Sequence, residues 1–224
     1  MSAPPLAFES VPLGGADGAT VTFAAAAREA VAIVGNSVSG IRLLGPLAMG
    51  LTDPTGGRVI VLETQPTSLP RRELLAYRRR VGYLPAGGGL LQNLTLAQNV
   101  ALPLRFGSDL ATNEIESRLT IMLAAAGLAA SGHLRPAQAT DEQRRRAALA
   151  RALAFDPKLV ILEEPFVGLT ERGARHILDT ARGGDVAGGS RRTVVAIGPN
   201  LPNSVVRRFD RRYRMMAGAL QEAD

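Results

Sequence analysis

Residues 30–40 have the sequence AVAIVGNSVSG, and this stretch decides the fold class. Its first five residues form a continuous apolar run, which is typical of a central strand buried on both faces of a sheet. Small residues follow from Gly35 to Gly40, and the composition from Ile41 to Ala48 predicts a helix. A strand, a small-residue loop and a helix form the geometry of a phosphate-binding loop, because backbone N–H groups and the positive end of the helix dipole face the anion. Alone, the pattern is weak evidence, since many α/β proteins contain it with nothing bound.

Strand and helix patterns alternate on both sides of this stretch. Two antiparallel strands are predicted around the glycine turn at 14–18. Further strands are predicted at 58–62, 81–84, 159–162, 193–197 and near the C-terminal end. Helices are predicted at 70–80, 113–126, 140–154 and 171–182. We expect Asn113 and Glu116 to form a capping box at the second helix, and Thr140 and Gln143 to form one at the third. The order indicates an α/β fold with a mostly parallel sheet.

Two acidic residues follow a second apolar strand. Glu163 and Glu164 end the run at 159–162, and the carboxyl ends of strands in an open parallel sheet are where ligands bind. Because the runs at 31–34 and 160–162 are both apolar on both faces, we expect them to be neighbouring, buried strands. A phosphate loop together with a pair of acids at a strand end is typical of a P-loop NTPase.

The composition narrows the functional classes. The 224 residues contain no cysteine, which excludes disulfides and cysteine-based zinc sites, and the two histidines leave little room for a histidine-based metal site. We therefore predict no metal site built from the chain's own residues. The formal net charge is +6, and 26 residues are basic, but aromatic residues make up only 4% of the chain, so contact with an anion is favoured and nucleic acid is not. We see no apolar run long enough to span a membrane and no secretory leader, and we expect a cytoplasmic protein.

Five stretches of the chain resemble the nucleotide-binding subunits of ABC transporters. They are residues 35–40, 79–83, 93–100, 143–153 and 159–165. The last two stretches, with the spacing between them, are highly specific. The resemblance implies an α/β, P-loop NTPase (ABC ATPase-like) core at residues 1–84 and 159–224, and a helical subdomain with a degenerate signature region at residues 85–158. Within the family, residues 147–152 and 164–168 look closest to the ATPase subunits of Mce/Mla-type lipid transporters.

The phosphate loop departs from the family's pattern, which reads GxxGxGK[ST]. Val38 takes the place of the second glycine, Ile41 that of the lysine and Arg42 that of the hydroxyl residue. In the family the lysine reaches the β- and γ-phosphates and the hydroxyl holds Mg²⁺. The only lysine of this chain, Lys158, lies at the start of a distant strand and cannot replace it.

Three other motifs of the family are also altered. Ala86 replaces the glutamine that follows the strand at 81–84, and Pro199 replaces the switch histidine. Asp141 and Glu142 replace the two glycines of the LSGGQ signature, which in the family faces a nucleotide bound by the second subunit of a dimer. Carboxylates at a helix N-terminus interact favourably with the positive end of the helix dipole. They therefore neutralise the positive potential that would attract a phosphate.

The resemblance assigns roles to the remaining site residues. Glu164 matches the general base, and Glu163 stands where the family has an Mg²⁺-linked aspartate. The alternative for both is a pair of acids that caps or salt-bridges the sheet edge. The weakly matching phosphate-loop positions are Gly35, Asn36, Ser37, Ser39, Gly40 and Arg42. ATP and Mg²⁺ as cofactors follow from the resemblance alone.

Three functional hypotheses remain open. The first is a degenerate ABC subunit with weak or no ATP hydrolysis, which acts as a scaffold or regulator of a membrane transporter, with lipid as the expected cargo. The second is a divergent ATPase in which Arg42 and Glu164 carry the chemistry, and the third is a module that binds nucleotide without turnover. The partners implied are a transmembrane permease and a second copy or an intact ATPase subunit, at the cytoplasmic face of the inner membrane.

Two more segments bear on these hypotheses. Gly87–Gly89 indicates either a mobile joint between core and helical subdomain or a plain loop. The arginine-rich segment 207–214 predicts a solvated face, with contact to anionic lipid headgroups as the alternative.

Overall fold

The fold is described from a computed structural model for residues 3–14, 18–183 and 191–223. Its strands are β1 (Leu6–Pro12), β2 (Thr20–Ala25), β3 (Ala30–Gly35), β4 (Arg58–Val61), β5 (Val81–Leu84), β6 (Leu159–Glu163), β7 (Thr193–Gly198), β8 (Arg211–Met216) and β9 (Ala219–Ala223). Its α-helices are α1 (Leu44–Ala48), α2 (Arg71–Arg79), α3 (Leu96–Gly107), α4 (Thr112–Ala125), α5 (Asp141–Ala152), α6 (Glu171–Arg182) and α7 (Asn203–Val206).

A six-stranded sheet in the order β5-β6-β7-β3-β8-β9 forms the centre of the fold. All its neighbouring strands are parallel except β8 and β9, which confirms the predicted α/β class with a mostly parallel sheet. The expectation that β3 and β6 are neighbours was wrong, because β7 lies between them and pairs with both. All three strands are apolar and buried, so hydrophobicity predicts that they are central but not their order.

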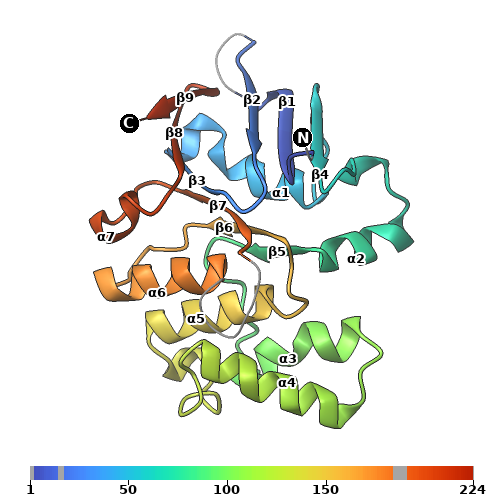
Figure 1. The fold of residues 1–224 in the computed structure, drawn as a ribbon, viewed down its shortest axis with the longest axis vertical. Coiled ribbons are helices and arrows are strands. Elements are labelled where there is room, and N and C mark those ends of the chain that lie inside the picture. The colour runs from blue at the N-terminus through green and yellow to red at the C-terminus, as the bar shows by residue number, and fades with distance from the viewer. Residues whose placement is uncertain (1–2, 15–17, 184–190, 224) are drawn as a thin grey trace.

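A three-stranded antiparallel sheet, β2-β1-β4, lies against one face of the central sheet (Figure 1). An apolar core fills the space between the two sheets and includes side chains of α1. The predicted N-terminal antiparallel strands are thus confirmed. The opposite face of the central sheet packs against α5 and α6 through a second core.

Helices α3 and α4 lie beyond α5, away from the central sheet (Figure 1). The sequence analysis did not predict α3, although Thr95 and Gln98 form a capping box at its start. The capping box predicted at Asn113 and Glu116 was wrong: α4 begins after Ala111, whose N–H donates to the Glu114 carboxylate at 2.7 Å. The division into residues 1–84 with 159–224 and residues 85–158 stays a prediction.

The arginine-rich segment near the C-terminal end is only in part a solvated face. Arg211 binds both carboxylate oxygens of Glu29, at 2.5 and 2.8 Å, and Arg208 pairs with Asp179. Arg207 and Arg214 are exposed. Of the five arginines in this segment, Arg208 and Arg211 therefore hold neighbouring elements together. Among the described residues, no helix has both the length and the apolar character that crossing a bilayer requires.

Candidate functional site

The carboxyl ends of β3, β6 and β7 meet at one edge of the central sheet, where they border an open cavity of about 270 Å³. The cavity is lined by Gly35, Asn36, Ile41, Arg42, Ala86, Glu163, Glu164, Ile197, Gly198 and Pro199. The structure thus brings together both predicted acids, the predicted loop positions Gly35, Asn36 and Arg42, and three further positions where the family's motif is altered. Ser39 and Gly40 belong to the same loop but not to the lining of the cavity.

The loop after β3 closes on itself through backbone hydrogen bonds. It consists of two short 3-10 turns, Ser37–Ser39 and Ile41–Leu43, which meet at Gly40. The Ser39 amide and hydroxyl both donate to the Asn36 carbonyl, at 3.1 and 2.7 Å, and the Leu43 amide donates to the Gly40 carbonyl at 3.0 Å. These donors are therefore not available to an anion.

The helix predicted from Ile41 is shorter than expected. The α-helix begins only at Leu44 and has five residues, because a 3-10 turn replaces its first turn. Gly40 sets this geometry with a φ of +82°, a value that favours glycine. A Cβ at Gly40 would overlap the Leu13 carbonyl oxygen and lie 2.7 Å from the Leu13 Cβ. Close packing against the end of β1 thus fixes the shape of the loop.

The side chains at the family's lysine and hydroxyl positions differ in exposure. Ile41 is 4% exposed and belongs to the apolar core between the two sheets. The Arg42 side chain is 69% exposed, and its Nη2 lies 3.7 Å from Oε1 of Glu164. The positive charge of this loop therefore faces an acid of the chain itself.

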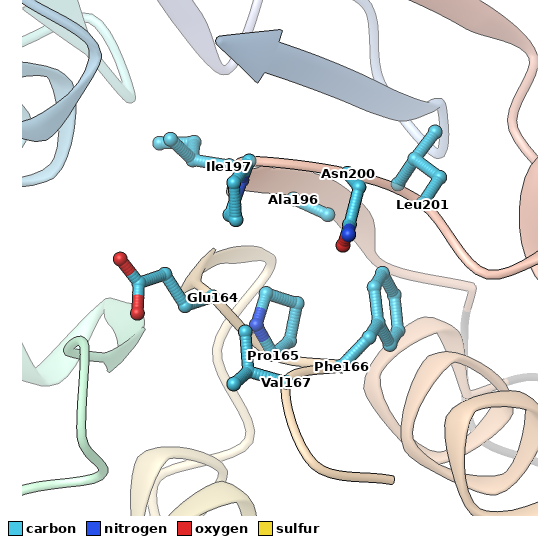
Figure 2. A pocket seen from close by; sticks show the side chains of 10 residues that line it. Glu164, Pro165, Phe166, Val167, Ala196, Ile197, Asn200 and Leu201 are labelled. Carbon is cyan, nitrogen blue, oxygen red and sulfur yellow. The ribbon is translucent and has the colours of Figure 1, made fainter. Parts of the chain in front are cut away.

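Glu164 has an unusual backbone conformation. Its φ is +47°, which is rare for a residue with a side chain, and its N–H donates to the Ile197 carbonyl at 2.6 Å. Strained residues of this kind cluster at functional sites. Figure 2 shows the Glu164 carboxylate turned away from Phe166 and Asn200, which border a shallow depression on the other side of the chain. The strained backbone thus directs the carboxylate towards Arg42.

The Glu163 side chain is buried, and one of its carboxylate oxygens is hydrogen-bonded. It is 9% exposed, and its Oε2 accepts the N–H of Ala86 at 3.0 Å, while Oε1 has no hydrogen-bond partner. Burial raises the pKa of the Glu163 carboxyl, and the nearby charge of Glu164 adds to this, whereas the hydrogen bond from Ala86 and the neighbouring Tyr83 side chain lower it. Both oxygens are thus engaged with, or packed against, the protein interior.

Gly45 provides the space for the Glu163 carboxylate. A Cβ at Gly45 would overlap Oε1 of Glu163 and lie 2.9 Å from Cε2 of Tyr83. Glutamate is one methylene longer than aspartate, and the missing side chain at position 45 accommodates that extra length. The sequence analysis missed Gly45 and Tyr83; the available signal was a glycine inside a predicted helix, which usually has a packing reason.

Replacing Gly45 by alanine is expected to destabilise the protein by about 1–3 kcal/mol, because the new methyl group must displace a buried carboxylate. The free energy of unfolding in urea measures the effect. Combining Gly45→Ala with Glu163→Ala should recover most of the loss. Gly56→Ala is the matched control, since its Cβ would meet only Pro12 at 3.4 Å. An equal loss at both glycines would contradict this account of Gly45.

The acids of the altered signature lie at the start of α5. The predicted capping box is confirmed: the Gln143 amide donates to the Thr140 hydroxyl at 3.2 Å, and the Thr140 amide donates to the Gln143 side chain at 2.9 Å. Asp141 and Glu142 occupy the first turn of the helix. Their charges therefore complement the helix dipole, as expected.

Arginines of α5 surround these acids. Arg144 pairs with Asp141, and Arg146 pairs with Glu142. Burial lowers the pKa of Arg145, while the charges of Glu164 and Asp141 raise it, so this guanidinium lies in the field of both acids. Its Nη1 is buried without a hydrogen-bond partner. The sequence analysis missed Arg145, because charge alone does not distinguish it from its two arginine neighbours.

A run of three glycines in the loop between β5 and α3 is held by Arg151. Gly87, Gly88 and Gly89 all have positive φ values. Arg151 of α5 donates to the carbonyls of Gly88 and Gly89, each at 2.7 Å. This run of glycines is therefore anchored to α5.

These residues do not match the way in which the family holds Mg-ATP. The Ser39 and Leu43 amides are hydrogen-bonded within the loop, the lysine position is an isoleucine in the core, and the Glu163 carboxylate accepts the Ala86 N–H. Within residues 3–14, 18–183 and 191–223, no three His, Cys, Asp or Glu side chains lie close enough together to hold a metal ion.

Comparisons with known proteins place the chain in a family. The family model described as "ABC transporter" matches residues 19–167. The chain is 33% identical over 146 residues to methionine import ATP-binding protein MetN 1 of Pseudomonas putida, covering 65% of this chain and 44% of that protein. It is 36% identical over 163 residues to MetN of Caulobacter vibrioides, covering 73% and 49%. The chain thus spans less than half the length of these relatives.

Solved structures show the same fold. The dimeric structure of MJ0796, a bacterial ABC transporter cassette, superposes with a TM-score of 0.84 at 24% identity, covering 98% of each chain. A post-hydrolysis state of the same cassette, bound to ADP and phosphate, gives a TM-score of 0.83. These similarities confirm the predicted fold. The Mce/Mla-type lipid subfamily finds no support, since the relatives named above are methionine import proteins. With the family model matching most of its length, the chain belongs to the family of ABC transporter ATP-binding domains.

Proposed function

We propose that this chain is an ABC-type subunit of a membrane transporter that binds Mg-ATP weakly or not at all and acts as a scaffold or regulator. The observation that carries the proposal is the burial of Ile41 at the lysine position, in a loop where the Ser39 and Leu43 amides donate to carbonyls of the same loop. Catalysis of phosphoryl transfer depends on assembling lysine, metal ligand and water-positioning groups together. Here Ile41, Arg42, Ala86 and Pro199 stand at four of those positions.

The proposed partners are a transmembrane permease and a second ATP-binding subunit, either another copy or an intact ATPase. The proposed location is the cytoplasmic face of the inner membrane. The methionine-import relatives favour an amino-acid importer over a lipid transporter as the complex in which the chain works.

A divergent ATPase is the second candidate, and the strained backbone of Glu164 favours it. In that function Arg42 supplies the missing positive charge and Glu164 activates water. The ion pair between them argues against it, because the guanidinium occupies the neighbourhood of the base before any nucleotide is present. A module that binds nucleotide without turnover is the third candidate.

We expect weak or undetectable binding in a calorimetric titration with Mg-ATP. Losing one charge-assisted phosphate contact costs about 1.5–3 kcal/mol, which corresponds to about 10- to 150-fold in affinity. A phosphate-release assay follows the titration, because binding with turnover indicates the divergent ATPase and binding alone indicates the nucleotide module.

Micromolar affinity for Mg-ATP would contradict the proposal. Arg42→Ala is then the decisive variant: if Arg42 supplies the missing charge, its removal abolishes binding. Arg207→Ala is the matched control, since Arg207 is also exposed but is the C-cap residue of α7, outside the cavity lining.

A further inference from the structure

Helices α6, α5 and α4 meet through two separate apolar cores. Helix α6 packs on the central sheet through Ile177 and Leu178, and the end of α4 packs on α5 through Ala126. Helix α5 contributes to both cores. Polar side chains make the direct contact between α6 and the end of α4, and they are Glu142 and Arg146 of α5 with His176 of α6.

An ion pair of α5 fits against two glycines. Arg146 and Glu142 pair one turn apart, and only 21% and 29% of their side chains are exposed. A Cβ at Gly173 of α6 would lie 2.9 Å from the carboxylate carbon of Glu142, and a Cβ at Gly127, just after α4, would lie 2.9 Å from Nη1 of Arg146. The ion pair therefore contacts both α6 and the end of α4.

His176 lies beside this ion pair. Its Nε2 is buried and, like Nε of Arg146, has no hydrogen-bond partner among the residues that the structure describes. Arg146 and Glu142 of α5 and Asp179 of α6 are the charged groups that face the imidazole. From α4, the uncharged backbone of Ala126 faces it. The ring is thus surrounded by three elements and has one positive and two negative neighbours.

Both acids near His176 already have cationic partners. Glu142 pairs with Arg146, and Asp179 pairs with Arg208. Burial lowers the pKa of His176 and the charge of Arg146 lowers it further, while the backbone at the end of α4 and the two acids offset part of this. The neutral imidazole is therefore the form that the folded protein accommodates.

We propose that Glu142, Arg146 and His176 form a latch that holds α6 against the end of α4 and opens when His176 takes up a proton. In the closed latch the neutral ring packs beside the ion pair. A protonated ring places a second positive charge next to Arg146 and leaves its buried Nε2–H without an acceptor, whereas in an open latch water supplies acceptors.

The lowered pKa of His176 sets the direction of the pH dependence. The latch contributes its full stability above the ordinary histidine pKa of 6.5, and it loses this contribution as the pH falls below that value. The proposal goes beyond the proposed function, because the latch requires neither a nucleotide nor a partner subunit.

The first test is proton NMR of the two imidazoles in the full chain. His133 is the one other histidine of the sequence, and it is exposed. Both signals are followed from about pH 8 to about pH 5, and His133→Gln assigns them by removing one. We expect the His176 signal to titrate clearly below pH 6.5. Titration at or above that value overturns the proposal, and this result does not depend on a variant of the latch being folded.

Hydrogen exchange tests whether protonation opens the latch. Amides of residues 122–127 and 171–178 are compared at about pH 7.5 and about pH 5.5, after correction for the intrinsic pH dependence of exchange. We expect their protection to fall by about three- to tenfold. Tenfold is the limit, because a free histidine one unit below its pKa is about tenfold more often protonated than neutral.

Substitution of each histidine shows which one causes the fall in protection. His176→Gln should abolish it, and His133→Gln is the matched control that should leave it unchanged. Thermal unfolding checks that every variant is folded. The proposal fails if protection in the unmodified chain does not change with pH, or if the fall persists in His176→Gln.

A further pair of variants tests the part that the ion pair plays. Glu142→Gln leaves the charge of Arg146 uncompensated beside His176, so we expect the His176 titration to move to lower pH by about half a unit to one unit. Asp141→Asn is the matched control, because it removes the same charge from the neighbouring position of α5, where Asp141 pairs with Arg144. An equal shift in both variants, or none in Glu142→Gln, contradicts the latch.

Discussion

Ile41→Lys combined with Arg42→Ser is expected to leave the chain without ATP hydrolysis. The two changes restore the family's lysine and hydroxyl, yet Ala86 and Pro199 still replace the groups that position water and sense the γ-phosphate. The loop also keeps Val38 at a glycine position, and it keeps the hydrogen bonds that the Ser39 and Leu43 amides donate to carbonyls of the same loop. Steady-state phosphate release measures the result, which we expect to stay at background level.

The acids of α5 are a second reason for this expectation. If the chain forms an ABC-type dimer, each nucleotide lies between the loop of one subunit and the signature of the other. In a self-pair of this variant, both sites contain Asp141 and Glu142 in place of glycine. In a pair with an intact ATPase, the partner's site contains these acids, and the site at the repaired loop still has Ala86 and Pro199 in place of the glutamine and the histidine. Like charges about 4 Å apart cost about 4 kcal/mol at an effective dielectric of about 20, which is enough to prevent closure around the γ-phosphate.

Adding Asp141→Gly and Glu142→Gly to the repaired loop should permit nucleotide-driven dimer formation, seen by size exclusion, while turnover stays limited. Thermal unfolding of the same variant is needed, because Arg144 and Arg146 lose their partners. Robust phosphate release by the unmodified chain, alone or with a partner, would contradict the scaffold function and support the divergent ATPase.

Replacing Gly40 by alanine is expected to destabilise the protein by about 2–4 kcal/mol. The left-handed backbone costs a residue with a side chain about 1–2 kcal/mol, and the overlap with the Leu13 carbonyl forces the loop or the end of β1 to move. Urea unfolding measures the change.

Gly14→Ala separates the two causes. Gly14 has a similar φ of +73°, but a Cβ there would meet nothing within 4 Å. We expect it to lose only about 1 kcal/mol, from backbone strain. If both variants lose the same free energy, contact with Leu13 does not shape the loop.

The sequence predicted the elements of the fold better than their arrangement. Apolar runs located the central strands because burial on both faces requires them. Strand order was not predictable in this way, since β7 is as apolar as the two strands that it separates. Helix α3 was missed although its capping box is readable at Thr95 and Gln98.

The candidate site was predictable in its positions but not in its bonding. Motif spacing located Glu163, Glu164 and Arg42, which the structure gathers around one cavity. The space that Gly45 provides for the longer acid depends on a contact between β6 and α1, residues far apart in the chain. Likewise, a loop of small residues predicts free amides, and only the folded backbone shows that the Ser39 and Leu43 amides donate to carbonyls of the same loop.

The two hydrogen bonds from Arg151 to the glycine run affect how often that loop changes conformation. Three successive residues with positive φ form a backbone that bends at little cost, yet two of their carbonyls are held by one guanidinium. At about 1.5 kcal/mol for each charge-assisted bond, releasing both leaves on the order of one molecule in a hundred with the loop detached. We therefore expect that a partner that displaces this loop also displaces α5, because Arg151 joins the two. This coupling does not require a bound nucleotide.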